Sequence, residues 1–114
     1  MSDLVFHMTR DGVDPVESRP DPEKVVKGDP VHTSWDHEAR DGLYAGLWQS
    51  TPGAWRFHYD EWEYIRVHSG HSVLTCDDGT VIEMKAGDSV IIRPGLSGVW
   101  EVTETMLKDY VIRA

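Results

Sequence analysis

The sequence predicts an all-β protein of one domain, in which short strands close into a barrel or a jelly roll. At least seven short segments have the composition of strands, turn residues separate them at roughly even intervals, and no segment has the apolar period of a helix. A chain of 114 residues has room for one hydrophobic core. Because short strands expose many unpaired edges, closing the sheet on itself is the simplest way to cover them.

The N-terminal part of the chain differs from the rest because proline interrupts it repeatedly, at Asp14-Pro15, Arg19-Pro20, Asp21-Pro22 and Asp29-Pro30. Proline blocks a long helix. We therefore predict an extended arm with short edge strands over residues 1–35, and a barrel over residues 36–114. The arm either lies across a second copy of the chain, in a homodimer, or forms a frayed tail. We expect three histidines in the arm or at its junction to be exposed: His7, His32 and His37.

The predicted strands of the barrel lie at residues 43–49, 55–59, 64–68, 72–76, 81–84, 89–92, 99–103 and 107–113. The dipeptide Asp78-Gly79 is typical of tight hairpins, so the strands on either side of it are expected to pair. A turn at Ser69-Gly70 separates the third predicted strand from the fourth. Residues 89–92 do not alternate between polar and apolar, which is typical of a strand covered on both faces.

The strand at residues 55–59 is predicted to place aromatic rings on one face. Side chains alternate across a strand, so Trp55, Phe57 and Tyr59 share one face and Arg56 and His58 share the other. With five Trp and four Tyr in the chain, we expect aromatic rings to line part of the barrel interior.

Charge and composition exclude several classes of partner. The formal charge of −9, from 20 acidic and 11 basic residues, argues against binding to nucleic acids and to membrane surfaces. The lone Cys76 permits no internal disulfide and fits a reducing compartment. Residues 1–10 do not resemble a signal peptide, and the longest apolar run, residues 90–92, is too short to cross a bilayer. We expect a cytoplasmic protein.

Two segments resemble known sequence motifs. Gly53, Glu63 and Gly70 resemble the first cupin motif, with six residues between Glu63 and Gly70, and residues 87–95 resemble the second, in which a Gly-Asp strand ends in a Pro-Gly turn.

Further matches resemble the small cupin type 3 group, also called domain of unknown function 861, over about residues 25–112. They are Gly46-Leu47-Trp48, Thr51-Pro52-Gly53, the Gly-Leu-x-Gly-x-Trp-Glu-Val run at residues 95–102, and Lys108-x-Tyr110. The group is similar to ethanolamine-utilisation cupins and to ureidoglycine aminohydrolase-like cupin domains. The resemblance implies an RmlC-like cupin jelly-roll barrel, also described as a double-stranded β-helix.

The same resemblance implies that most of the metal ligands of cupins are missing. Metal-binding cupins hold a transition metal with three histidines and a glutamate. Here Phe57 and Tyr59 stand at two of the histidine positions and Gly98 at the third, which leaves Glu63. A register shifted by one residue provides His58 and Glu63 as a two-ligand fragment. No cofactor is therefore expected, and a divalent transition metal held by these two residues is the alternative.

Glu63 is the candidate for the main polar group of the interior, and the best candidate for a catalytic residue. Five aromatic residues are predicted to bind a ligand with it, or else to fill the barrel: Trp48, Phe57, Tyr59, Trp100 and Tyr110. A carboxylate among aromatic rings suits an amine through charge pairing and cation–π contact. The first hypothesis is therefore binding of a small amine- or ureide-like metabolite. A metal-dependent hydrolase or lyase acting on a nitrogenous metabolite and a non-catalytic dimeric accessory protein are the alternatives.

Overall fold

The computed structural model describes residues 3–114, so the first two residues of the predicted arm lie outside the described part of the chain. Residues 3–114 form nine strands and one short 3-10 helix, η1, at Pro22–Lys24. The strands are β1 (Val16–Ser18), β2 (Val25–Gly28), β3 (His32–Arg40), β4 (Leu43–Ser50), β5 (Gly53–His58), β6 (Trp62–Cys76), β7 (Val81–Lys85), β8 (Ser89–Ile92) and β9 (Ser97–Arg113). The predicted all-β class is confirmed.

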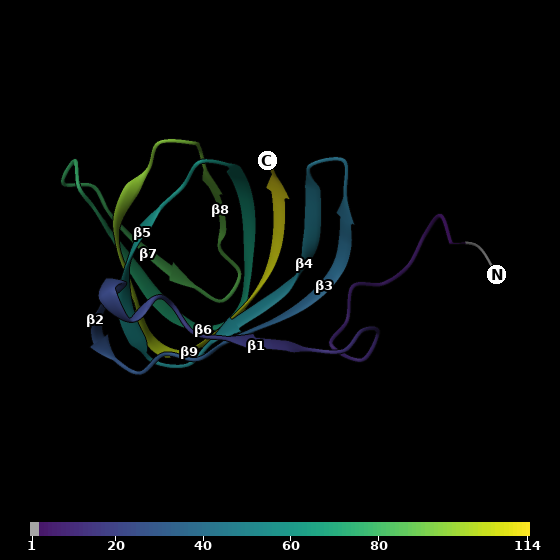
Figure 1. The fold of residues 1–114 in the computed structure, drawn as a ribbon, viewed down its shortest axis with the longest axis horizontal. Coiled ribbons are helices and arrows are strands. Elements are labelled where there is room, and N and C mark those ends of the chain that lie inside the picture. The colour runs from purple at the N-terminus through teal and green to yellow at the C-terminus, as the bar shows by residue number, and fades with distance from the viewer. Residues whose placement is uncertain (1–2) are drawn as a thin grey trace.

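One antiparallel sheet curls round to form the barrel (Figure 1). Its strand order is β1-β3-β4-β9-β5-β2, and β6 pairs with β7, β8 and β9 outside that path. The first half of β9 pairs with β5 and the second half with β4, while β6 pairs with β9 along most of its length. The two long, bent strands β6 and β9 therefore connect the walls of the barrel. This arrangement is the predicted jelly roll.

Two pairs of predicted strands are each a single strand in the structure. The segments 64–68 and 72–76 join in β6, and the segments 99–103 and 107–113 join in β9. At Ser69-Gly70 the chain forms an irregularity in the β6–β9 pairing instead of the predicted turn. Gly70 has φ +86°, and a Cβ on it would lie 2.6 Å from the Cα of Met106. The glycine therefore marks a close approach of two strands, where sequence patterns indicated a chain reversal.

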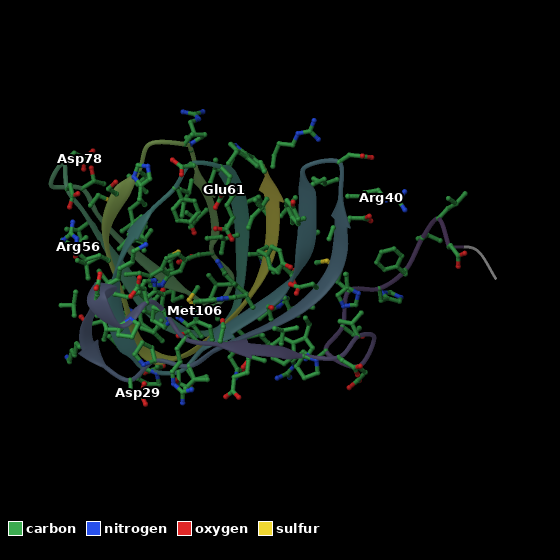
Figure 2. All side chains as sticks on the ribbon, in the orientation of Figure 1. Asp29, Arg40, Arg56, Glu61, Asp78 and Met106 are labelled. Atoms are coloured by element: carbon green, nitrogen blue, oxygen red, sulfur yellow. The ribbon has the colours of Figure 1, made fainter. Side chains whose placement is uncertain are left out.

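The hairpin at Asp78-Gly79 is confirmed, because β6 and β7 pair on either side of it, with Thr75 opposite Val81. Figure 2 shows Asp78 at the outer tip of this hairpin. The prediction that residues 89–92 are covered on both faces is wrong. Ile91 is 57% exposed and Ile92 is 2% exposed, because this strand, β8, is buried on one face only.

The first 35 residues contribute to the sheet at both of its ends. β1 pairs with β3 and β2 pairs with β5, and β3 begins before the boundary predicted at residue 36. Residues 3–15 contain no strand (Figure 1), and part of this segment lies against β3, where the ring of His37 donates a hydrogen bond to the carbonyl oxygen of Thr9 and Arg10 lies over the ring of Trp35. The homodimer expected from the sequence stays a prediction, which sedimentation velocity can test. No helix within the described residues has the length and apolar character that crossing a membrane requires.

The hydrophobic core lies inside the curled sheet. Met106 is fully buried there, and Figure 2 shows it between the two walls of the barrel. Trp55 and Trp100 are part of the core and also line a cavity inside the barrel, so the core forms one wall of that cavity.

Candidate functional site

A cavity of about 420 Å³ opens into the barrel between β3, β4, β5, β6 and β9. It is lined by all six residues predicted to bind a ligand: Trp48, Phe57, Tyr59, Glu63, Trp100 and Tyr110. The alternation predicted for residues 55–59 is also present. Phe57 faces the cavity, whereas Arg56 lies on the outer face, where it pairs with Asp77. The structure thus gathers the predicted residues, and their role in binding stays a prediction.

Glu63 forms a buried ion pair with Lys108. Its carboxylate Oε2 lies 2.9 Å from the Lys108 Nζ, and the two side chains are 3% and 5% exposed. The Tyr59 hydroxyl donates a hydrogen bond to the other oxygen, Oε1. Glu63 is therefore not the only polar group among the aromatic rings, because a lysine and a tyrosine hydroxyl engage its two oxygens. Desolvating a carboxylate is costly, and a paired ammonium with a further hydrogen bond offsets that cost.

Two tryptophans complete the surroundings of the Lys108 ammonium. Its Nζ lies 4.6 Å from the ring centroid of Trp48 and 4.8 Å from that of Trp100, within the range of cation–π attraction. The carboxylate of Glu63 and the two indole rings therefore form an ammonium-binding cage. The protein's own lysine occupies the cage, in the position where a ligand amine was expected.

Strand alternation places Tyr110 beside Lys108, two residues along the same face of β9. The Tyr110 hydroxyl donates to Oδ1 of Asp36 at 2.5 Å. Asp36 pairs with Gly46, and Gly46 pairs with Tyr110, so the hydrogen bond spans β4. A Cβ at Gly46 would lie 3.0 Å from the Tyr110 hydroxyl and closer still to the backbone carbonyl of Trp35. Glycine at this position therefore leaves the space in which Tyr110 reaches Asp36.

Both tyrosines remain hydrogen-bond donors at neutral pH. Burial, followed by the nearby Glu63 carboxylate, raises the pKa of Tyr59 well above its usual value. Burial and the hydrogen bond to Asp36 likewise raise the pKa of Tyr110. Each phenol consequently holds a carboxylate in place and does not serve as an anion.

His32 is partly buried and lines the cavity, so the expectation that it is exposed is wrong. Its ring lies 4.5 Å from that of Trp55 and 4.9 Å from that of Trp48. No sequence pattern indicated this position, because β3 begins at His32, where the proline-rich arm was expected to continue. Within the described residues, the buried Nε2 of His32 and the buried Nε1 of Trp100 have no hydrogen-bond partner.

Desolvation, with a smaller contribution from Lys108, lowers the pKa of His32 from 6.5 to about 4. The unfolded chain therefore takes up this proton at a higher pH than the folded protein does. We expect His32 to reduce stability progressively as the pH falls from 6.5 to about 4.

Thermal unfolding of the wild type and of His32→Gln between about pH 7.5 and about pH 4.5 measures this effect. The wild type should lose more thermal stability than the variant over this interval. His7→Gln, which changes a histidine of the extended arm, is the control and should follow the wild type. Parallel curves for the wild type and His32→Gln would contradict the assignment.

The residues around Glu63 do not fit a transition metal. Tyr59 and Lys108 engage its two oxygens, and an ammonium at 2.9 Å would repel a cation. No group of three or more His, Cys, Asp or Glu side chains with metal-binding geometry occurs within residues 3–114. His58 faces away from the cavity and contacts Ser97 and Asp60. The structure therefore does not bring together the two-ligand fragment, His58 and Glu63.

Comparison with known proteins gives a family match and no curated relative. The family model of the EutQ-like cupin domain matches residues 37–110. No curated protein matches the chain significantly.

Solved structures share the fold. A protein of unknown function of the DUF861 family from Pseudomonas syringae pv. tomato is 25% identical, with a TM-score of 0.77, and the match covers 88% of this chain and 43% of that one. EutQ from Clostridium difficile is 17% identical, with a TM-score of 0.67 and coverage of 74% and 63%. A DUF861 protein from Thermotoga maritima is 28% identical, with a TM-score of 0.55 and coverage of 56% and 73%. The present chain thus matches less than half the length of the Pseudomonas protein.

Proposed function

The chain belongs to the family of EutQ-like cupin domains, and from this premise we propose that it binds a small amine- or ureide-like metabolite in the barrel cavity, without a standard metal centre. The cavity itself is the observation that carries the proposal. Its volume of about 420 Å³ lies in the range of small-molecule sites, and its walls combine aromatic rings with a few polar groups.

Two buried ring nitrogens support binding. The indole N–H of Trp100 and the Nε2 of His32 have no partner within the described residues, although both side chains line the cavity. A buried polar atom without a hydrogen bond costs free energy. A ligand or an ordered water that bonds to these nitrogens would recover part of that cost.

The Lys108–Glu63 pair changes how a ligand is expected to bind. The sequence suggested Glu63 as the direct contact for a ligand amine, but Lys108 already neutralises it. In the proposal Glu63 orients Lys108, and the ligand packs on the rings of Trp48, Phe57 and Tyr59. Glu63 thus acts as a positioning residue, and Lys108 is a hydrogen-bond donor on the cavity wall.

The test is a panel of amines, ureides and amino acids, measured first by thermal shift and then by isothermal titration calorimetry. At least one compound should raise the melting temperature and bind with measurable heat. Phe57→Ala should weaken its binding about fivefold, because an aromatic contact contributes on the order of 1 kcal/mol.

Arg56→Ala is the matched control, since Arg56 is the neighbour of Phe57 on the outer face of β5 and pairs with Asp77. This variant should bind as the wild type does. If no compound of the panel shifts the melting temperature or titrates, the proposal is wrong.

A further inference from the structure

The cavity has two polar levels that are one strand repeat apart. In the pairing of β4 with β9, Trp48 lies opposite Lys108 and Gly46 lies opposite Tyr110. Asp36 of β3 is at the second level, opposite Gly46. Two residues along a strand correspond to about 7 Å. The Lys108 ammonium and the Asp36 carboxylate therefore belong to neighbouring levels of the same wall.

The inner level offers hydrogen-bond donors. Lys108 is 4% exposed and its ammonium carries three N–H groups, of which Glu63 accepts one. The Trp100 indole N–H, on a side chain that is 3% exposed, has no acceptor within the described residues. An oxygen acceptor on a ligand matches this level.

The outer level offers negative charge. Asp36 is exposed, accepts hydrogen bonds from Tyr110 and Ser34, and has no cationic partner within residues 3–114. Glu61 lines the same cavity, and Figure 2 shows it toward the open upper end of the barrel. Lys108 neutralises Glu63. The carboxylates of Asp36 and Glu61 therefore set the charge at the entrance of the cavity. A protonated amine matches this level.

From this arrangement we infer that the ligand carries two functional groups, a carbonyl or carboxylate oxygen directed at Lys108 and Trp100 and a protonated amine directed at Asp36 and Glu61. The inference rests on the proposed binding function and names the class of ligand: short amino acids or amino amides whose two groups are separated by several bonds. A simple amine or a simple carboxylic acid satisfies one level only.

Three probes of equal carbon number test the inference by calorimetry: 4-aminobutanoate, butylamine and butanoate. The compound with both groups should bind at least tenfold more tightly than either compound with one group. Asp36→Asn should weaken 4-aminobutanoate and butylamine about tenfold and leave butanoate unchanged, because one charge-assisted contact contributes on the order of 1.4 kcal/mol. Glu38→Gln, which removes a carboxylate of β3 that pairs with Arg40, is the control and should change none of the three.

Trp100→Phe tests the inner level, because it keeps an aromatic ring and removes the N–H. This variant should bind 4-aminobutanoate and butanoate more weakly than the wild type does, and its affinity for butylamine should be unchanged. If a compound of the wider panel binds but none of the three probes does, or if Asp36→Asn and Trp100→Phe weaken all probes equally, the inference is overturned and the proposed function stands. If nothing binds at all, both are wrong.

Discussion

Lys108→Met is expected to lower the free energy of unfolding by about 3 to 5 kcal/mol, because it leaves the Glu63 carboxylate buried without its cation. Glu63 is 2% exposed, so water does not replace the lost ammonium. The Tyr59 hydroxyl still donates to one oxygen, but a single neutral donor does not compensate a buried charge. Denaturant unfolding, followed by tryptophan fluorescence, measures the change.

A double-mutant cycle separates the free-energy contribution of the ion pair from that of the packing of the lysine side chain. Glu63→Gln alone leaves the ammonium unpaired and should also destabilise the protein. The combination of Lys108→Met with Glu63→Gln should cost less than the sum of the single changes, since it removes both charges.

The control is an exposed ion pair of the same type. Lys27 lies 3.1 Å from Glu101, and the side chains are 71% and 37% exposed. Lys27→Met should change the free energy of unfolding by at most about 1 kcal/mol. If Lys108→Met costs no more than Lys27→Met, the buried pair does not have the structural importance assigned to it here.

Gly98→Ala is the second substitution with a large expected effect. A Cβ at this position would lie 2.8 Å from the Cα of Cys76 and closer still to the carbonyl oxygen of Thr75. Both are backbone atoms of β6, so the two longest strands would have to separate. We expect a loss of about 2 to 3 kcal/mol in the free energy of unfolding, as for other overpacked sites.

Gly12→Ala is the control, because the nearest obstacle to its Cβ is the side chain of His37, which can move. It should leave the stability near that of the wild type. An equal loss in the two variants would show that close packing of β6 against β9 is not the cause. The same contact explains a feature of the sequence, since Gly98 stands where metal-binding cupins are expected to have a histidine and no side chain fits there.

Local signals in the sequence were sufficient for most of the fold. Asp78-Gly79 predicted a hairpin that the structure contains, because a tight turn is specified by its own residues. Ser69-Gly70 was misread because its conformation depends on Met106 and Thr105, which are distant in sequence. A glycine in a close strand crossing and a glycine in a turn look alike in a single sequence.

The candidate site shows the same limit. Alternation and the cupin resemblance identified Glu63 and the aromatic rings, but not Lys108 as the partner of Glu63. Lysine is seldom buried, so composition argues for exposure unless the pairing of β9 with β4 is known. One available signal was the Lys108-x-Tyr110 spacing, which puts both side chains on one face of a strand. His32 and Asp36 depend on the pairing of β3 with β4, for which no local motif exists.

The Lys108 ammonium has a consequence for how the barrel maintains its charge. A metal ion is in equilibrium with its surroundings, so its occupancy follows the supply of that metal and the presence of chelators. A lysine is attached by covalent bonds, so each folded copy carries the positive charge from the moment the cage closes around it. The barrel needs no loading step to place a basic group beside Glu63, and this group cannot dissociate from the protein as a metal ion can.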